Sequence, residues 1–447
     1  MKTLVELMRR GLKSLRRCTS GNVALMFALS LPVIFLTVGG AIDFSRMMQL
    51  RSQMQDAVDA ASVGSVGINS QAFKAGIAMT SDGTITVGSS QAQNIFNSNV
   101  RSSTDLTGVA FAATVAKSGT TIKSTVTVTG NYQTTILKLF GFNSLPITIT
   151  SVSTVTVPPY IDFYLLLDNS PSMGVGATTN DINTMVANTP DQCAFACHEL
   201  DKPSTGPNMD YYDLAKSLGV TTRIDVVRQA TQNLMTTAKN TETLVNQYRM
   251  AIYDFGLSAA TIDPQAPTAY QVSSLNANLS TSSSNAAAID LMTMPSQGYN
   301  SDRETNFSST LASMNSLIPA AGSGLTASNP QEVLFMVSDG ATDSYDCGYS
   351  DGNTCRRITP MDNTTCTALK ARGVRIAVLY TTYLPLPTNS FYNTYLAKYV
   401  AAPSQLASNM QSCATPGLYF EVSPSQGISS AMNALFQKVV SVVRINS

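Results

Sequence analysis

The stretch "YLLLDNSPSMGVG", Tyr164–Gly176, decides how the second half of this chain folds. It continues an almost unbroken apolar run that begins at Tyr160, is interrupted only by Asp162, and stops abruptly at Asp168 and two serines. A short apolar run with turn residues behind it indicates a strand that is buried on both faces. We therefore expect a parallel sheet, with Asp168, Ser170 and Ser172 at the carboxyl end of one of its strands.

Strand and helix patterns alternate along the rest of this half. Short apolar runs predict strands at 333–337, 376–380 and 418–422, and helical spacing predicts helices at 224–234 and 432–443. This alternation is typical of a doubly wound, mainly parallel α/β sheet with helices on both faces. Ligands of such sheets bind beyond the carboxyl ends of the strands, and there the run "VLFMV" is followed by Ser338 and Asp339.

An acid followed by hydroxyls at alternate positions suits a hard divalent cation. Mg²⁺ takes oxygen ligands at about 2.1 Å and keeps some of its waters. Hydroxyl ligands such as Ser170 and Ser172 are neutral, so the ion can accept one more carboxylate from a partner. "DNSPS" is also a common turn sequence, because Asn, Pro and Ser favour turns. Thr305 and Asp339, which follow in order, favour the metal interpretation.

Residues 159–443 resemble the von Willebrand factor A domain, whose metal-ion-dependent adhesion site has the signature D-x-S-x-S. The resemblance implies an Mg²⁺ or Mn²⁺ ion bound by three hydroxyls, with two carboxylates holding its waters. The implied ligands are Ser170, Ser172 and Thr305, and the implied carboxylates are Asp168 and Asp339. The chain departs from the family pattern in two places: charged residues precede the threonine where the family has glycines, and residues 175–220 form an insertion.

Six of the seven cysteines lie after Pro159. In an oxidising compartment an even number predicts disulfides, and we expect them to pin the insertion beside the ion. The candidates are Cys193, Cys197, Cys347, Cys355, Cys366 and Cys413, with Cys366 and Cys413 as one expected pair between two helices. The alternative for Cys193, Cys197 and His198 is a zinc half-site, for which no fourth ligand is evident in the sequence.

Residues 23–42, "VALMFALSLPVIFLTVGGAI", carry no charge. As a helix they would reach about 30 Å, the thickness of a membrane's hydrocarbon core. Basic residues dominate 1–20 and Asp43 follows the span, so the positive-inside rule places 1–20 in the cytoplasm and the remainder outside. We expect an uncleaved anchor; a cleaved signal peptide is the alternative, for which this segment is long.

The span is predicted to continue as a helix to about residue 62. Its apolar stripe has helical spacing and consists of Met47, Leu50, Met54, Ala57 and Ala61. The partner of this stripe is either the protein's own next domain or a neighbouring membrane-anchored subunit. Roughly residues 15–66 resemble the amino-terminal segment of TadE/TadG-like proteins of bacterial tight-adherence (Flp) pilus assembly systems. The resemblance is carried by the opening GNVA, the proline in the span, the aspartate after it and the closing AxDAA.

Residues 67–157 are rich in β-branched alternation and predict a small α+β domain. The expected strands are "GTITVG", "GVAFAATVAK", "TTIKSTVTVTGNY" and "LPITITSVSTVTV", with a hairpin at "KSGTT" and a helix at 89–99. Its expected role is spacing or subunit contact. Pro158 and Pro159 mark the boundary to the last domain, 158–447, so the predicted order is basic leader 1–20, helix 21–66, middle domain and A-like domain.

The composition of the chain argues against two classes of function, nucleic-acid binding and catalysis. Lys plus Arg and Asp plus Glu both number 28, and no basic stripe with interleaved aromatics appears, so we expect no nucleic-acid partner. The single histidine has no evident partner base, so we expect no enzyme and no catalytic residue.

The resemblances imply a pilus assembly component in the bacterial inner membrane, with its bulk in the periplasm. Its divalent-cation-dependent contacts would be with other pilus subunits or with a surface protein that offers an acidic residue. The alternative is a surface adhesin that binds host or matrix ligands directly. The sequence leaves open whether the protein reaches the cell surface.

Overall fold

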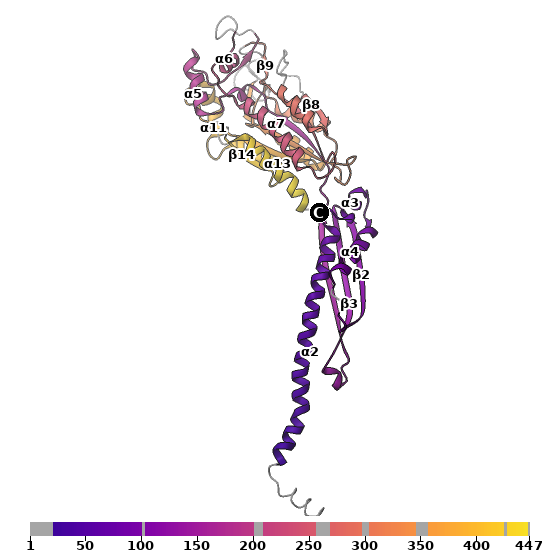
Figure 1. Ribbon diagram of the computed structural model, residues 1–447. Helices are drawn as coiled ribbons and strands as arrows, with labels where there is room; N and C mark the ends of the chain where they lie inside the picture. Colours follow the sequence, from indigo (N-terminus) through magenta and orange to yellow (C-terminus); the bar gives the residue numbers. More distant parts are fainter. Residues whose placement is uncertain are drawn as a thin grey trace, which may run out of the picture. The chain divides into compact units, whose positions relative to one another are not determined.

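The structure is a computed structural model that describes residues 21–100, 103–200, 209–255, 269–296, 304–345, 356–423 and 427–445. The chain divides into two compact units, Met1–Val157 and Pro158–Ser447 (Figure 1). The division falls at the proline pair where the sequence predicts a domain boundary.

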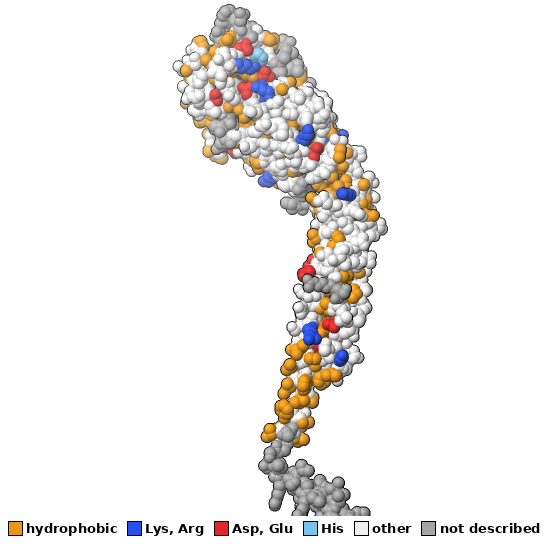
Figure 2. All heavy atoms as spheres, in the orientation of Figure 1, with side chains coloured by type: hydrophobic (Ala, Val, Ile, Leu, Met, Phe, Trp, Pro, Cys, Tyr) orange, Lys and Arg blue, Asp and Glu red, His pale blue; other side chains and the backbone are white. Residues whose placement is uncertain are grey.

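The apolar segment and the stretch after it form one helix, α2 (Gly21–Val66), which contains Pro32. Side chains in its first half face outward: Val23 is 72% exposed and Leu29 70%. Figure 2 shows the resulting band of hydrophobic side chains along the lower part of the helix. α2 is long and apolar enough to cross a membrane.

The second half of α2 packs inside its own unit. Its apolar stripe is buried against α4 (Thr86–Asn99) and the sheet beside it. The residues in this core include Leu50, Met54, Ala57, Ala61, Phe96, Val126 and Val128, with Met47 partly buried at its edge. The protein's own next domain is therefore the partner of the stripe in this structure.

A four-stranded antiparallel sheet completes the first unit, in the order β1-β2-β3-β4. The strands are β1 (Gly83–Thr84), β2 (Leu106–Ser118), β3 (Thr121–Gln133) and β4 (Ser144–Thr156), and the turn η1 (Leu137–Phe140) joins the last two. Alternate side chains of β3 are buried under the helices, while its threonines face outward. The predicted hairpin at residues 117–121 forms, with Ser118 paired to Thr121.

One predicted strand of this unit is wrong for most of its length. Within "GTITVG" only Gly83 and Thr84 pair with β2, and α4 begins at Thr86. The reason is tertiary: α4 packs so tightly that a Cβ on Gly88 would lie 2.7 Å from the Cβ of Ala72. Ala72 belongs to α3 (Gln71–Ala78), a short helix that the sequence patterns did not predict.

The second unit is built on a six-stranded sheet in the order β14-β13-β10-β5-β7-β8. The strands are β5 (Ile161–Leu167), β7 (Tyr248–Asp254), β8 (Tyr270–Asn276), β10 (Gln331–Ser338), β13 (Arg375–Thr381) and β14 (Tyr419–Val422). Neighbours are parallel except for β7 and β8, and every residue of β5 is buried. The predicted doubly wound, mainly parallel sheet is confirmed. It also contains β7 and β8, two strands that the sequence patterns did not predict.

Helices cover both faces of this sheet. One face packs against α7 (Arg223–Thr241), α8 (Leu279–Asn285) and α13 (Ile428–Ile445). The other packs against α9 (Phe307–Leu317), α10 (Thr364–Ala371) and α12 (Gln405–Cys413). The predicted helices 224–234 and 432–443 lie within α7 and α13.

The remaining elements lie in connections between these strands and helices. The insertion holds α5 (Thr179–Asn188), β6 (His198–Glu199) and α6 (Tyr211–Ser217), after the short turn η2 (Pro171–Gly174). β6 pairs with β9 (Thr293–Met294), and β11 (Ala341–Tyr345) pairs with β12 (Arg356–Pro360). The other short helices are η3 (Ala286–Ala288), η5 (Tyr392–Leu396) and α11 (Ala397–Val400).

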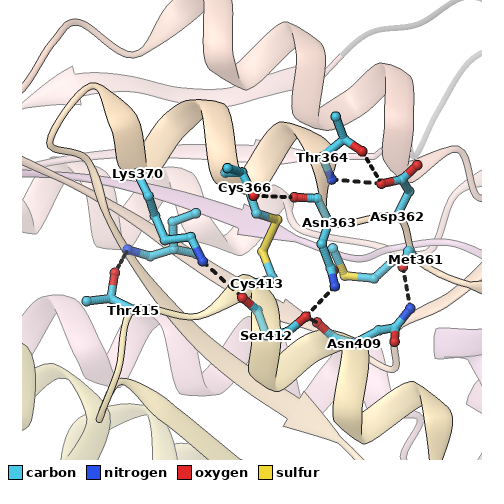
Figure 3. Close-up of a disulfide and its surroundings, with 12 residues drawn as sticks. Met361, Asp362, Asn363, Thr364, Cys366, Lys370, Asn409, Ser412, Cys413 and Thr415 are labelled. Atoms are coloured by element: carbon cyan, nitrogen blue, oxygen red, sulfur yellow. Dashed lines mark hydrogen bonds between the residues drawn. A yellow bond between two sulfur atoms is a disulfide. The ribbon is translucent and has the colours of Figure 1, made fainter.

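One predicted disulfide forms. Cys366 of α10 and Cys413 of α12 are bonded, with their Cα atoms 5.3 Å apart (Figure 3). Beside the bond, Lys370 Nζ donates to the Ser412 carbonyl at 2.9 Å, which also ties the two helices together. The pair joins two helices, as expected.

The insertion differs from the prediction. Cys193 is a free cysteine, and no disulfide joins it to Cys197, so the predicted bond at Cys193 is wrong. Its Sγ instead accepts a hydrogen bond from Phe195 N at 3.4 Å and lies 3.5 Å from Phe195 O, within one tight turn. Cys347 and Cys355 lie outside the described residues.

Candidate metal centre

The acid and the two serines of the opening stretch lie at the carboxyl end of β5, the predicted position. Asp168 Oδ1 accepts hydrogen bonds from the Ser170 N–H at 3.0 Å and from Ser170 Oγ at 2.6 Å. Ser170 Oγ in turn lies 3.2 Å from Ser172 Oγ. Asp168 and Ser170 are fully buried. The loop therefore gathers a carboxylate and two hydroxyls in one place.

The neighbouring strand β10 brings a second acid to the same edge. Ser338 Oγ donates to Asp168 Oδ2 at 2.5 Å, which ties the ends of β5 and β10 together. Asp339 Oδ1 accepts from the Ala341 N–H at 3.1 Å, while Asp339 Oδ2 accepts no hydrogen bond from any residue that the structure describes. Gly340 has a φ of +72°, in the left-handed region that favours glycine, so the chain turns away directly after Asp339.

Carboxyl groups gather at these strand ends. Burial, and then the charge of Asp339, raise the pKa of Asp168 to about 7. Asp254, the last residue of β7, is also buried, and burial followed by the charge of Asp168 raises its pKa well above the usual range. Asp254 Oδ1 accepts no hydrogen bond from the described residues. Buried carboxylates with unbonded oxygens favour a bound cation, because an uncompensated charge is costly to bury.

A buried arginine approaches this cluster from α7. Arg223 Nη1 lies 3.8 Å from Asp339 Oδ2, and both side chains are fully buried. The guanidinium stacks 4.8 Å above the ring of Tyr383, and its Nη2 donates to the Thr382 carbonyl at 3.3 Å. Burial, and then the charge of Asp339, raise the pKa of the Tyr383 hydroxyl well above its ordinary value.

Thr305, the fifth predicted site residue, lies directly before Asn306, the N-cap of α9. Its backbone pairs with Asp343: the Thr305 N–H donates to Asp343 O at 2.9 Å, and the Asp343 N–H donates back at 3.0 Å. Thr305 and Ser172 line the same pocket, which has a volume of about 240 Å³. Thr305 therefore faces the same pocket as Ser172.

The insertion forms part of the wall of this pocket. It contributes Cys193, Phe195, Cys197 and Glu199. Other elements contribute apolar side chains, namely Met294, Ile358, Phe391 and Leu396. The pocket thus combines two hydroxyl-bearing residues of the predicted metal site with a largely apolar surface.

The donor set decides which ion could bind. Among the described residues no group of three or more His, Cys, Asp or Glu side chains is arranged to hold a metal ion. An ion at this edge would therefore need the serine hydroxyls as ligands, and an oxygen set of this kind fits Mg²⁺ or Mn²⁺. Cys193, Cys197 and His198 likewise form no such group among the described residues, so the alternative zinc half-site is not arranged in this structure.

Sequence patterns missed three residues of this cluster. Asp254 ends the apolar run "RMAIYD", residues 249–254, so the signal that marked Asp168 was present there too. Arg223 and Tyr383 have no comparable signal, because only the packing of α7 and of the chain after β13 brings them to Asp339.

One protein-family model matches a segment of the first unit. Residues 21–66 match the family model described as "Putative Flp pilus-assembly TadE/G-like". This match covers α2 alone. Comparison with curated proteins finds no match.

Several solved structures are similar to the chain at low identity. The von Willebrand factor domain of the type V pili tip protein Mfa5 from Porphyromonas gingivalis is 9% identical, with 64% of this chain and 97% of that chain covered and a TM-score of 0.34. The pilus adhesin SpaC from Lactobacillus rhamnosus GG is 12% identical over 75% of this chain and 34% of that chain, with a TM-score of 0.35. Proximal thread matrix protein 1 from the mussel byssus, solved with a zinc-occupied MIDAS motif, is 10% identical over 63% and 46%, with a TM-score of 0.32.

Proposed function

We propose that this protein is a membrane-anchored component of a Flp-type pilus system whose second unit makes divalent-cation-dependent contacts with a partner protein. The observation that carries the proposal is the edge where β5, β7 and β10 end. There Asp168, Asp254 and Asp339 are buried together, two of them with unbonded oxygens, beside the hydroxyls of Ser170 and Ser172.

Two groups of side chains would hold Mg²⁺ or Mn²⁺ in different ways. Ser170, Ser172 and Thr305 would supply neutral oxygen ligands, while Asp168 and Asp339 would hold waters of the ion. The bound ion would supply a positive centre able to accept a carboxylate from a partner. The apolar pocket beside Ser172 would take a neighbouring apolar side chain of that partner.

The anchor completes the proposal. α2 would cross the inner membrane with the basic residues of 1–20 in the cytoplasm, which leaves the second unit in the periplasm. The partner is then another pilus subunit or a surface protein with an exposed acid. We assign no catalytic role to the site, because the proposal uses its serines as ligands of the ion rather than as nucleophiles.

A titration tests the metal site. Isothermal calorimetry of the full-length protein in detergent should show Mg²⁺ binding that Asp168→Asn abolishes. Asp162→Asn is the matched control, because Asp162 is buried at the opposite end of β5, where it pairs with Arg249 at 2.7 Å. Equal Mg²⁺ binding by the wild type and Asp168→Asn would remove the proposed site.

Crosslinking tests the partner. A photo-crosslinker at Leu200, which is 52% exposed in the insertion, should capture a protein in cells that is lost when EDTA is added. If the same protein is crosslinked equally well with and without EDTA, the contact does not depend on a divalent cation. Loss of pili on deletion of the protein supports the assembly role, whereas intact pili with lost attachment would support the adhesin.

A further inference from the structure

The turn between β3 and β4 exposes large apolar side chains. Leu139 is 77% exposed, Phe142 57% and Phe140 37%. Residues 135–142, "TILKLFGF", contain one lysine and no acid. A short turn of this composition is unusual for a surface that faces only water, because contiguous exposed apolar groups mark contact sites.

The turn packs against the helix that is predicted to span the membrane. Gly39 of α2 leaves room for Ile136: a Cβ at position 39 would lie 2.3 Å from Ile136 Cγ2. At Gly40 the corresponding distance to Leu137 Cδ2 is 3.6 Å. Because the two glycines have no side chains, the turn packs closely against α2 at these positions.

A buried carboxylate fixes the turn there. Asp43 accepts hydrogen bonds from the backbone N–H groups of Thr135, Ile136 and Leu137, at 3.0, 2.8 and 2.7 Å. Asp43 is fully buried by these contacts. Backbone N–H groups that enter a membrane need such partners, because lipid offers none.

The position of the contact sets its level in the membrane. Gly39 lies three residues before Ile42, the end of the charge-free segment, which is about 5 Å along a helix. Side chains of α2 on either side of Gly39 are exposed as well, with Val38 at 54% and Ile42 at 41%. The exposed apolar surface of α2 and that of the turn are therefore at the same level.

We propose that the η1 turn is a second membrane contact, which inserts Leu139, Phe140 and Phe142 into the lipid leaflet at the Asp43 end of α2. This inference rests on the proposal that α2 spans a membrane. Lys138 would reach the lipid headgroups beside them, as lysines at interfaces do. Two attachment points would hold the four-stranded sheet in a fixed orientation on the membrane.

Tryptophan fluorescence tests this directly, because the chain contains no tryptophan. The full-length protein is reconstituted into phosphatidylcholine vesicles with or without brominated acyl chains, which quench nearby indoles. Phe142→Trp reports on the turn and Phe35→Trp on the span. Val152→Trp is the matched control: Val152 is 52% exposed on β4, eight residues from the start of the strand and about 27 Å along it.

We expect the tryptophan emission of Phe142→Trp to be blue-shifted. Brominated lipids should reduce its fluorescence about as much as that of Phe35→Trp, and should leave the fluorescence of Val152→Trp unchanged. Adding Gly39→Leu should displace the turn and reduce the quenching of Phe142→Trp alone. Quenching of Phe35→Trp without quenching of Phe142→Trp overturns the inference. Blue-shifted but unquenched emission at position 142 assigns the turn to a second copy of the chain and overturns it as well.

The same experiment separates this inference from the proposals on which it depends. If Phe35→Trp itself is unquenched, α2 does not span the membrane and both proposals fall together. The result is independent of Mg²⁺, so it leaves the metal site of the second unit untouched.

Discussion

Replacing Arg223 with methionine tests the charge balance of the candidate metal centre. Arg223 Nη1 lies 3.8 Å from Asp339 Oδ2 with both groups fully buried. At an effective dielectric constant of about 20, this separation corresponds to an attraction of about 4 kcal/mol. Methionine keeps much of the buried volume and removes the charge, so Asp339 loses its nearest positive partner.

Two effects with opposite signs follow. Without metal, Arg223→Met should lower the free energy of unfolding by about 3–5 kcal/mol, because an unpaired carboxylate remains buried. Mg²⁺ should bind more tightly, because it no longer competes with the guanidinium for Asp339. If half of the pair's attraction is recovered, the gain is about 2 kcal/mol, or about 30-fold in affinity.

Calorimetric titration and thermal unfolding of the full-length protein in detergent, with Mg²⁺ and with EDTA, measure both effects. Arg249→Met is the matched control: Arg249 pairs with Asp162 at 2.7 Å at the opposite end of the sheet and is partly exposed, so it should cost less stability and leave Mg²⁺ affinity unchanged. If Arg223→Met binds Mg²⁺ no more tightly than the wild type, the buried arginine does not oppose the ion and the electrostatic reasoning is wrong.

Further predictions concern pH and the cysteines. Burial raises the pKa of Asp168 to about 7 and that of Glu332 to about 8, above their unfolded values, so the EDTA-treated protein should lose stability as the pH rises from about 5 to 8.5. Thermal unfolding measured across this pH range checks the prediction. Mg²⁺ should restore the stability lost through Asp168, and Glu332→Gln should remove the loss that is due to Glu332. A melting temperature that does not change with pH would contradict the burial of these two carboxyl groups. Replacing Cys366 and Cys413 with alanine opens a loop with a sequence separation of 47 and should cost about 4 kcal/mol by the chain-entropy model, measured by urea unfolding with reduced wild type as control. Cys193→Ser should remove one titratable thiol with little change in melting temperature, whereas a drop of disulfide size would show that Cys193 is bonded after all.

The predictions from sequence succeeded where a pattern is local. The buried run before Asp168 became β5, because a short apolar run that ends at turn residues fits a strand buried on both faces. The uncharged segment became α2, because the apolar stripe that continues it has helical spacing. They failed at "GTITVG", where β-branched residues favour a strand but the packing of α4 against α3 favours a helix. They failed again at Cys193, because an even count of cysteines does not place two sulfur atoms within bonding distance.

The sequence alone determined the order of the parts: an apolar helix, a β-rich middle domain, and an α/β domain with an acid and two serines at a strand end. It also placed Asp168 and Asp339 at strand ends, since both follow apolar runs. Only the tertiary structure decided what surrounds them, because Arg223, Asp254 and Tyr383 are distant in the chain and meet Asp339 and Asp168 through the packing of β7, α7 and β13. The same holds for Asp43, whose three hydrogen bonds to the β3–β4 turn join residues more than ninety positions apart. Charge balance at a buried site depends on such long-range neighbours, and no local pattern encodes them.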